Sequence, residues 1–349
     1  MAIRLGIIGY GGMAGWHATN VCRVPDVSVR AVYDIDPVRL DLGKKDGYIA
    51  YDTLETFLAD PEINLVLVAT PNDVHPDLAI AAMDAGKHVI CEKPVAMSLK
   101  EFDRMTAAAQ RNQVVFTAHH NRRWDKDYQT AKAVLESGEL GQVFTIQSRL
   151  HGTGGTIFGW RAEPEHGGGM MFDWGVHFLD QLFDMCGYDT FTEVYCQFTQ
   201  VMSAEVEDYF TLVMNSNKGY RAQIEIGTYM LHDMPRWLIG GDEGTCFIQD
   251  FQAKEGNIIK AGTKMEDQPV VLMTDSGPTR TFAPRPKNVK QYLPLPAVNR
   301  EWTELYHNVD LAMQGKAELI VQPWQVRKVI AAMEACFESA RTGKVVSLL

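Results

Sequence analysis

The sequence lacks the features that would place it in a membrane, on a nucleic acid or in a disulfide-rich scaffold. No apolar run approaches the roughly 20 residues needed to cross a bilayer. No lysine or arginine cluster offsets the formal net charge of -11, which argues against nonspecific binding to nucleic acids or anionic membranes. The six cysteines are scattered without a C-x-x-C pair, so no disulfide framework is expected.

The start of the sequence also lacks the charged, apolar and small-residue segments of a signal peptide, because a strand pattern begins directly after the first residues. A chain of 349 residues is long for one hydrophobic core, so two domains are expected. We therefore expect a soluble, cytoplasmic, two-domain protein. Its partner should be a small molecule rather than a nucleic acid or a membrane.

The first 34 residues carry the pattern of a dinucleotide-binding unit. An apolar run over 3–8 predicts a buried strand, a helical pattern follows the glycine motif, and a second strand pattern over 29–33 ends at Asp34. The glycines permit a tight turn and a close approach to a pyrophosphate, which the helix N-terminus would bind. Asp34 lies about 20 residues beyond the motif, where a carboxylate binds ribose hydroxyls and repels a 2′-phosphate. We therefore predict NAD rather than NADP, bound by Gly9, Tyr10, Gly11, Gly12, Met13 and Asp34.

Strand and helix patterns continue to alternate up to about residue 122. Buried strand patterns at 65–69, 88–91 and 114–118 predict a doubly wound parallel sheet, the Rossmann arrangement. Ligands of such sheets bind beyond the carboxyl ends of the strands, where polar residues recur in this sequence. From this edge we expect further cofactor contacts by Thr70, Asn72, His75, Glu92, Lys93 and Asn121.

A second polar group follows the glycine triplet Gly167-Gly168-Gly169. If this stretch is helical, Asp173, His177 and Asp180 share one face, with an apolar stripe behind them. An imidazole one turn from a carboxylate can serve as an oriented general base. Lys93 follows a buried strand directly, and a cation there would favour a developing alkoxide, the alternative being a solvated surface lysine.

The remaining residues predict a second α/β domain. Alternating runs between 192 and 250 are separated by turn signals and predict an antiparallel meander. Helical patterns follow at 300–313 and 323–341, after an excursion over 262–298 that we leave unassigned. The glycine-dense loop over 151–169 is either a flexible connector or a lid over a cleft.

The ten histidines do not predict a metal site. His119 and His120 would face opposite sides of a strand, and His177 with Asp173 lacks a third ligand at a suitable spacing. We therefore expect no metal.

Three motifs are similar to those of the Gfo/Idh/MocA oxidoreductase family. They are the glycine motif, the string Gly86-Lys87-His88-Val89…Glu92-Lys93-Pro94, and Asp173-Trp174-Gly175-Val176-His177. In the glycine motif, Ala14 stands at the last position, where the family commonly has a glycine. The resemblance spans nearly the whole chain. It implies a Rossmann domain over 1–122 and an α/β domain over 123–349 with an open, mostly antiparallel sheet. It further implies that the helix at 323–341 packs back on the first domain and that the sheet assembles a homodimer or homotetramer.

The expected function is NAD-dependent oxidation of a secondary alcohol on a sugar, an inositol-like polyol or a related compound. The resemblance implies that Lys93, Asp173 and His177 correspond to the family's catalytic residues, with His177 taking the hydroxyl proton. Two alternatives remain: glycoside hydrolysis by transient oxidation with tightly held NAD, and a non-catalytic NAD-sensing regulator. We expect substrate contacts by Asn121, Arg122, Trp160, Arg161 and Asp180.

Overall fold

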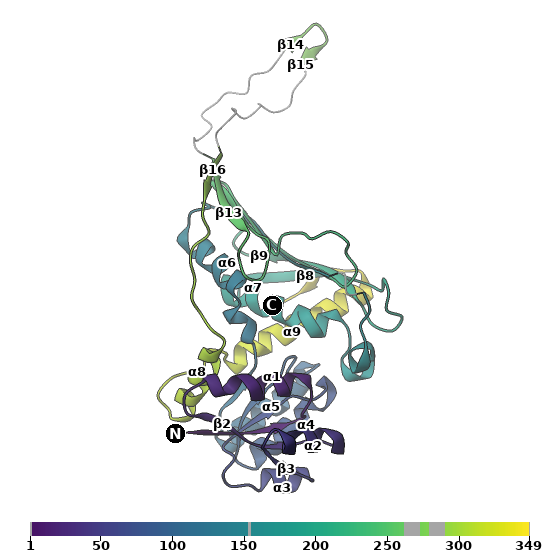
Figure 1. Cartoon of the computed structure of the whole chain (residues 1–349). Helices are drawn as coiled ribbons and strands as arrows, with labels where there is room; N and C mark the ends of the chain where they lie inside the picture. The colour runs from purple at the N-terminus through teal and green to yellow at the C-terminus, as the bar shows by residue number, and fades with distance from the viewer. Residues whose placement is uncertain (1, 153–154, 262–272, 279–289, 349) are drawn as a thin grey trace.

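The computed structural model describes residues 2–152, 155–261, 273–278 and 290–348. It has two domains, the first purple to blue and the second teal to green in Figure 1, with the yellow helix near the C-terminus between them. Most of the excursion at 262–298 falls in 262–272 and 279–289, which lie outside the described residues. Among the described helices, none has the length and apolar character required to cross a membrane.

The first domain contains the predicted parallel sheet, with strand order β3-β2-β1-β4-β5-β6. The order reverses between β1 and β4, and such a switch point opens the crevice in which dinucleotides bind. Its strands read as apolar runs because both faces of the sheet are buried. The elements are β1 (Ile3–Ile8), α1 (Gly12–Asn20), β2 (Val27–Tyr33), α2 (Pro37–Lys45), β3 (Ile49–Tyr51), α3 (Leu54–Leu58), β4 (Leu65–Val68), α4 (His75–Asp84), β5 (His88–Cys91), α5 (Leu99–Asn112) and β6 (Phe116–Ala118).

The second domain is built on a nine-stranded sheet of order β16-β13-β12-β11-β7-β10-β9-β8-β17. The sheet is mostly antiparallel, as expected, although β7 and β10 pair in parallel. Helices α6, α7 and α9 pack on it around the second hydrophobic core. The elements up to β13 are α6 (Lys126–Ser137), β7 (Val143–His151), α7 (Val176–Cys186), β8 (Phe191–Thr199), β9 (Tyr209–Ser216), β10 (Arg221–Gly227), β11 (Trp237–Gly241), β12 (Gly244–Ile248) and β13 (Gly256–Ala261). The strands β14 (Met273–Thr274) and β15 (Gly277–Pro278) pair as a separate ribbon. The sheet is completed by β16 (Lys290–Leu293) and β17 (Val346–Ser347).

The last two helices connect the domains. Helix α8 (Thr303–Met313) buries Leu305 and Tyr306 in the core of the first domain, which corrects the predicted boundary that placed everything after residue 122 in the second. Helix α9 (Pro323–Thr342) contributes Ile330 to the first core and Met333 to the second. A helix with apolar residues on two sides can contact two cores at once.

Candidate active site

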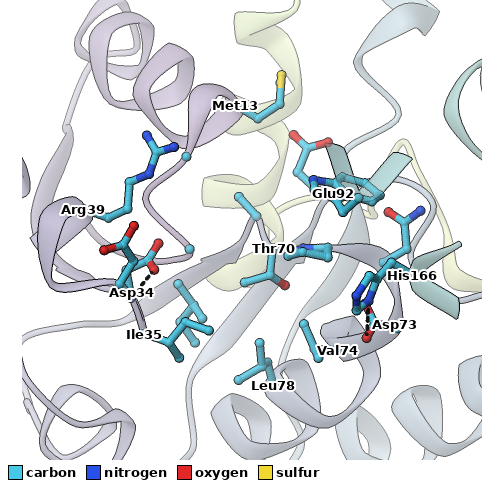
Figure 2. A pocket seen from close by; sticks show the side chains of 18 of the residues that line it. Met13, Asp34, Ile35, Arg39, Thr70, Asp73, Val74, Leu78, Glu92 and His166 are labelled. Atoms are coloured by element: carbon cyan, nitrogen blue, oxygen red, sulfur yellow. Dashed lines mark hydrogen bonds and ion pairs between the residues drawn. The ribbon is translucent and has the colours of Figure 1, made fainter. Parts of the chain in front are cut away.

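The glycine motif lines a cleft of about 650 Å³ at the β1–β4 switch point, together with the side chains of Met13, Asp34 and Thr70 (Figure 2). Gly9 adopts φ +86°, and a Cβ there would lie 2.6 Å from the Thr70 side chain, so only glycine fits the turn. A Cβ added at Gly11 or Gly12 would meet no atom within 4 Å, because both face open space. The N-terminus of α1 carries no side-chain cap, so its N–H groups can bind an anion. The cleft therefore fits a dinucleotide pyrophosphate.

Asp34 lies at the rim of this cleft beside Arg39 (Figure 2). One carboxylate oxygen accepts a hydrogen bond from the Tyr10 amide (2.6 Å), and the other accepts from the Asp36 amide (2.8 Å). Backbone donors thus fix the orientation of the carboxylate where the predicted ribose hydroxyls would bind.

Two predicted cofactor contacts are corrected by the structure. The Tyr10 side chain is buried, and its hydroxyl donates to Asp46 (2.7 Å). His75 is also buried, with its ring nitrogens 2.9 Å from the carbonyl oxygens of Pro94 and Thr70. Both side chains support loops around the cleft instead of lining it.

Lys93 lines the cleft and contacts Asp173. Lys93 follows β5, and its Nζ donates to the Asp173 carboxylate (3.0 Å) and to the Asp173 carbonyl (2.9 Å). Arg161 Nε donates to the same carboxylate oxygen (3.3 Å). Burial raises the pKa of Asp173, but the charges of Lys93 and Arg161 outweigh it and hold that pKa below its ordinary value. Asp173 is therefore an anion that keeps Lys93 in place.

His177 lies one turn further along and is almost completely buried. Its Nδ1 has no hydrogen-bond partner within the described part of the chain, and its ring centroid is 6.1 Å from that of Trp174. Burial, followed by the charges of Lys93 and Arg122, lowers the pKa of His177 well below its ordinary value. The imidazole is consequently neutral near pH 7 and able to accept a proton.

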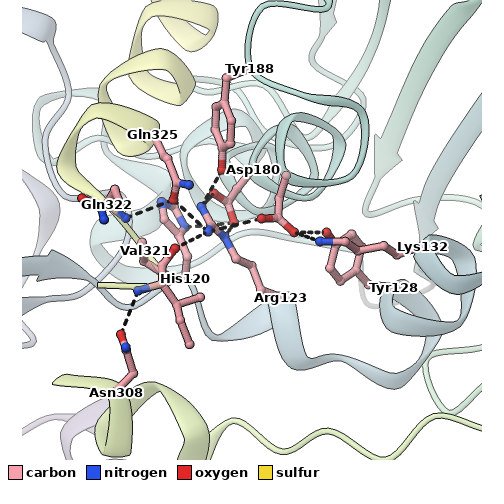
Figure 3. Close-up of polar contacts among 12 residues, drawn as sticks. His120, Arg123, Tyr128, Lys132, Asp180, Tyr188, Asn308, Val321, Gln322 and Gln325 are labelled. Carbon is pink, nitrogen blue, oxygen red and sulfur yellow. Dashed lines mark hydrogen bonds and ion pairs between the residues drawn. The ribbon is translucent and has the colours of Figure 1, made fainter. Parts of the chain in front are cut away.

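The predicted substrate contact of Asp180 is corrected by its buried ion pair. Met171–Gly175 forms a π-helical turn, so the α-helical spacing holds between His177 and Asp180, which both lie in α7, but not between Asp173 and either of them. Asp180 is buried and accepts two bonds from Arg123, at 2.9 and 2.7 Å (Figure 3). Arg123 also donates to Gln325 of α9 (3.0 Å) and to the Tyr188 hydroxyl (2.8 Å). Asp180 therefore joins the domains instead of contacting substrate.

The glycine triplet brings the end of the predicted lid against the cleft. Trp160, Arg161 and His166 line the cleft, with the Arg161 guanidinium 4.3 Å from the Trp160 ring centroid. Asn72, also at the cleft, donates to the Gly167 carbonyl (2.9 Å). Substrate contacts by Trp160 and Arg161 stay predictions.

A second cavity, also of about 650 Å³, contains Asn121 and Arg122. Asn121 lines this cavity and not the dinucleotide cleft, so its predicted cofactor contact is not supported. The Arg122 guanidinium lies 4.2 Å from the ring centroid of Trp174, which follows Asp173. This cavity therefore borders the turn that carries Asp173, through Trp174, and its walls also include Trp16, Trp302 and Phe251.

Glu92 is held in a buried network that the sequence did not reveal. Its carboxylate lies 2.7 Å from His17 Nε2 and 2.9 Å from His119 Nδ1, and the Tyr306 hydroxyl lies 2.7 Å from His17 Nδ1. Burial raises the pKa of Glu92, yet His119 and His17 together hold it well below its usual range. The donor atoms of His17, Glu92 and His119 lie within 4.8 Å of one another, as the ligands of a metal would, and His17 Nε2 hydrogen-bonds the Glu92 carboxylate at 2.7 Å. We interpret the group as a support for the loop before Lys93.

Comparisons with known proteins agree with this geometry. Residues 3–120 match the oxidoreductase family with an NAD-binding Rossmann fold, and residues 128–247 match the GFO/IDH/MocA C-terminal domain. An uncharacterized oxidoreductase of Schizosaccharomyces pombe is 30% identical over 86% of this chain and 85% of its own length. The scyllo-inositol 2-dehydrogenase (NADP(+)) IolW of Bacillus subtilis is 28% identical over 99% of this chain and 96% of its own.

Among solved structures, an NAD-binding protein from Listeria innocua has a TM-score of 0.88 and 35% identity, covering 99% of this chain and 97% of that one. Its similarity extends over both domains, as do the two family matches together. The chain therefore belongs to the Gfo/Idh/MocA family of oxidoreductases and is an NAD-binding dehydrogenase.

Proposed function

We propose that the protein transfers hydride reversibly between NAD(H) and a secondary alcohol of a sugar, an inositol-like polyol or a related polyhydroxy compound. The observation that carries this proposal is the contact of Asp173 with Lys93, which lines the dinucleotide cleft, together with a neutral His177 one helical turn after Asp173. The inositol dehydrogenase name of the Bacillus subtilis relative supports the polyol class. NAD, when bound, supplies the hydride acceptor.

In the proposed mechanism, His177 takes the proton of the reacting hydroxyl. Its buried imidazole is neutral because burial and the Lys93 charge disfavour its protonated form. Lys93 lies where it can stabilise the negative charge that develops on the alcohol oxygen. Asp173 keeps the Lys93 ammonium in position through their hydrogen bond, and Arg161 shares that carboxylate. We further propose that Arg122 and Asn121, in the second cavity, contact the substrate together with Trp160 and Arg161.

We also propose that the enzyme works in the cytoplasm as a homodimer or homotetramer assembled through the nine-stranded sheet. The two alternative functions are less well supported. A regulator would need neither Lys93 nor His177, and the chain has both, with Lys93 lining the cleft. A hydrolase that regenerates its NAD would retain the cofactor through purification and release no net NADH.

Kinetics of Lys93→Met and His177→Ala test the proposed roles. Each change should lower kcat by about 10²- to 10⁴-fold, the usual contribution of general acid–base or electrostatic catalysis, while the Kd for NAD changes less than about threefold. The measurement is NADH formation across a panel of polyols, sugars and sugar acids.

The exposed residues Lys100 and His232 provide matched controls, since Lys100→Met and His232→Ala should retain wild-type kcat. Near-normal turnover by either active-site variant would refute the assigned role. Failure of the wild-type protein to form NADH from every compound in the panel would refute the proposed reaction itself.

A further inference from the structure

The glycine triplet lies where three parts of the molecule converge. A Cβ at Gly167 would lie 2.5 Å from the Met97 sulfur in the first domain, and one at Gly168 would lie 2.4 Å from the Arg161 carbonyl oxygen. A Cβ at Gly169 would lie 2.5 Å from both carboxylate oxygens of Glu207. The triplet is thus packed closely against the first domain, the lid segment and the loop between β8 and β9.

Glu207 caps the helix that begins after this triplet. Its side-chain oxygen accepts from the Met171 amide (2.9 Å), and its backbone carbonyl accepts from the Met170 amide (3.0 Å). These amides belong to the helix N-terminus, where donors lack partners within the helix and a carboxylate is favourable. Glu207 is buried, and burial raises its pKa to about 7. The mechanism described above leaves this carboxyl group without a role.

The turn that Glu207 caps carries Asp173. Met171–Gly175 is the π-helical turn, and the Asp173 amide donates to the Gly169 carbonyl (3.1 Å). Single π-turns are rare, and surrounding contacts must hold them against relaxation to the α-helical register. Such a relaxation would rotate Asp173 about the helix axis and away from the Lys93 ammonium.

We infer that Glu207 is a positioning residue for catalysis, which holds the π-turn so that Asp173 meets Lys93. Its carboxylate fixes the Met171 amide and fills the space beside Gly169, and both contacts fix the start of the helix. The inference rests on the proposed function for its kinetic consequence. Its geometric consequence, the Asp173–Lys93 contact, can be measured without any substrate.

The test compares Glu207→Ala, Glu207→Gln and Gly169→Ala. Glu207→Ala should lower kcat by about 100-fold, as expected for a misplaced catalytic group, with KM for NAD and alcohol changed less than about threefold. Glu207→Gln keeps an acceptor for the Met171 amide and should stay within about threefold of wild type. Gly169→Ala displaces the carboxylate by a different route, and its kcat should fall as in Glu207→Ala. Glu205→Gln, an exposed change in the same loop, is the matched control.

The second readout is the rate at which acetic anhydride modifies Lys93, measured by mass spectrometry relative to the exposed Lys100. Loss of the Asp173 contact should raise this ratio at least about threefold in Glu207→Ala, because the hydrogen bonds to Asp173 hold the Lys93 amine against the turn and limit its access to the reagent. Glu207→Gln should leave the ratio unchanged.

An unchanged ratio in a folded Glu207→Ala protein would overturn the inference, whether or not the polyol screen succeeds. An equal rise of the Lys93 modification ratio in Glu207→Gln and Glu207→Ala would also overturn the inference. Glu207→Gln keeps an acceptor for the Met171 amide and should therefore keep the π-turn in place. If Glu207→Ala does not fold, Gly169→Ala decides by the same two readouts.

Discussion

At the scale of single residues, Asp34 should determine the choice between NAD and NADP. Its carboxylate is fixed at the rim of the cleft by two backbone amides, so it cannot swing away from a 2′-phosphate. Asp34→Asn keeps acceptors for these amides but removes the repelling charge. We expect the preference for NAD, measured as the ratio of kcat/KM values for the two cofactors, to fall by about 10- to 100-fold.

Arg39 lies in the same cleft as Asp34. Once Asp34→Asn removes the negative charge, the Arg39 guanidinium is available to bind the 2′-phosphate of NADP. Asp41→Asn, an exposed change in α2, should leave the ratio unaltered. Wild-type enzyme that uses NADP as well as NAD would contradict this role of Asp34.

The place of a residue in the structure was easiest to predict where it depends only on the neighbouring residues in the sequence. The glycine turn before α1 and Asp34 after β2 could be placed because turn, helix N-terminus and strand end are local features. Glu207 had no such signal: it stands in a polar stretch, and its burial depends on contact with Gly169. His17 was likewise missed, since its partner Glu92 is 75 residues away.

At the scale of elements, the helix after the glycine triplet was predicted but its partners were not. An amphipathic pattern identifies a helix and a polar face, yet it does not say which element that face will meet. The π-turn changed the register between Asp173 and Asp180, and Arg123 supplied a buried partner from the other side of the domain junction. Helix α8 follows the second domain in the sequence, but its apolar residues join the core of the first.

The Arg123–Asp180 pair should be a major stabilising contact between these elements. Both side chains are buried, so Asp180→Asn removes the bidentate partner of the Arg123 guanidinium and leaves Asp184, at 3.5 Å, as its remaining carboxylate (Figure 3). We expect this change to lower the free energy of unfolding by about 3–5 kcal/mol, measured by urea denaturation.

Asp189 offers a surface comparison, since it pairs with Lys328 and its side chain is 87% exposed. Asp189→Asn should cost no more than about 1 kcal/mol. Equal losses from the two substitutions would show that Asp180 contributes no more than a surface ion pair.

At the scale of the whole molecule, the face of the nine-stranded sheet opposite to α6, α7 and α9 has the character of a contact surface. Cross-strand partners place Tyr195, Val213, Gln223, Gln147 and Leu238 in one row across five neighbouring strands. Paired residues share a face of the sheet, and Tyr195 is 40% exposed. A row of partly exposed apolar and amide side chains suits a self-complementary interface between two copies of the chain.

If the sheets assemble the oligomer, a charge in this row should dissociate it. Two-fold symmetry would bring each introduced carboxylate near its copy or into an apolar contact, so Leu238→Glu should raise the dimer dissociation constant by about 100-fold or more. Sedimentation velocity should then detect a monomer where the wild-type chain gives a dimer or tetramer. Val38→Glu, an exposed change in α2, should leave the mass unaltered. The wild-type protein could prove monomeric, or Leu238→Glu could leave its oligomer intact. Either result would exclude this face as the interface and would mean that the face stays exposed to solvent.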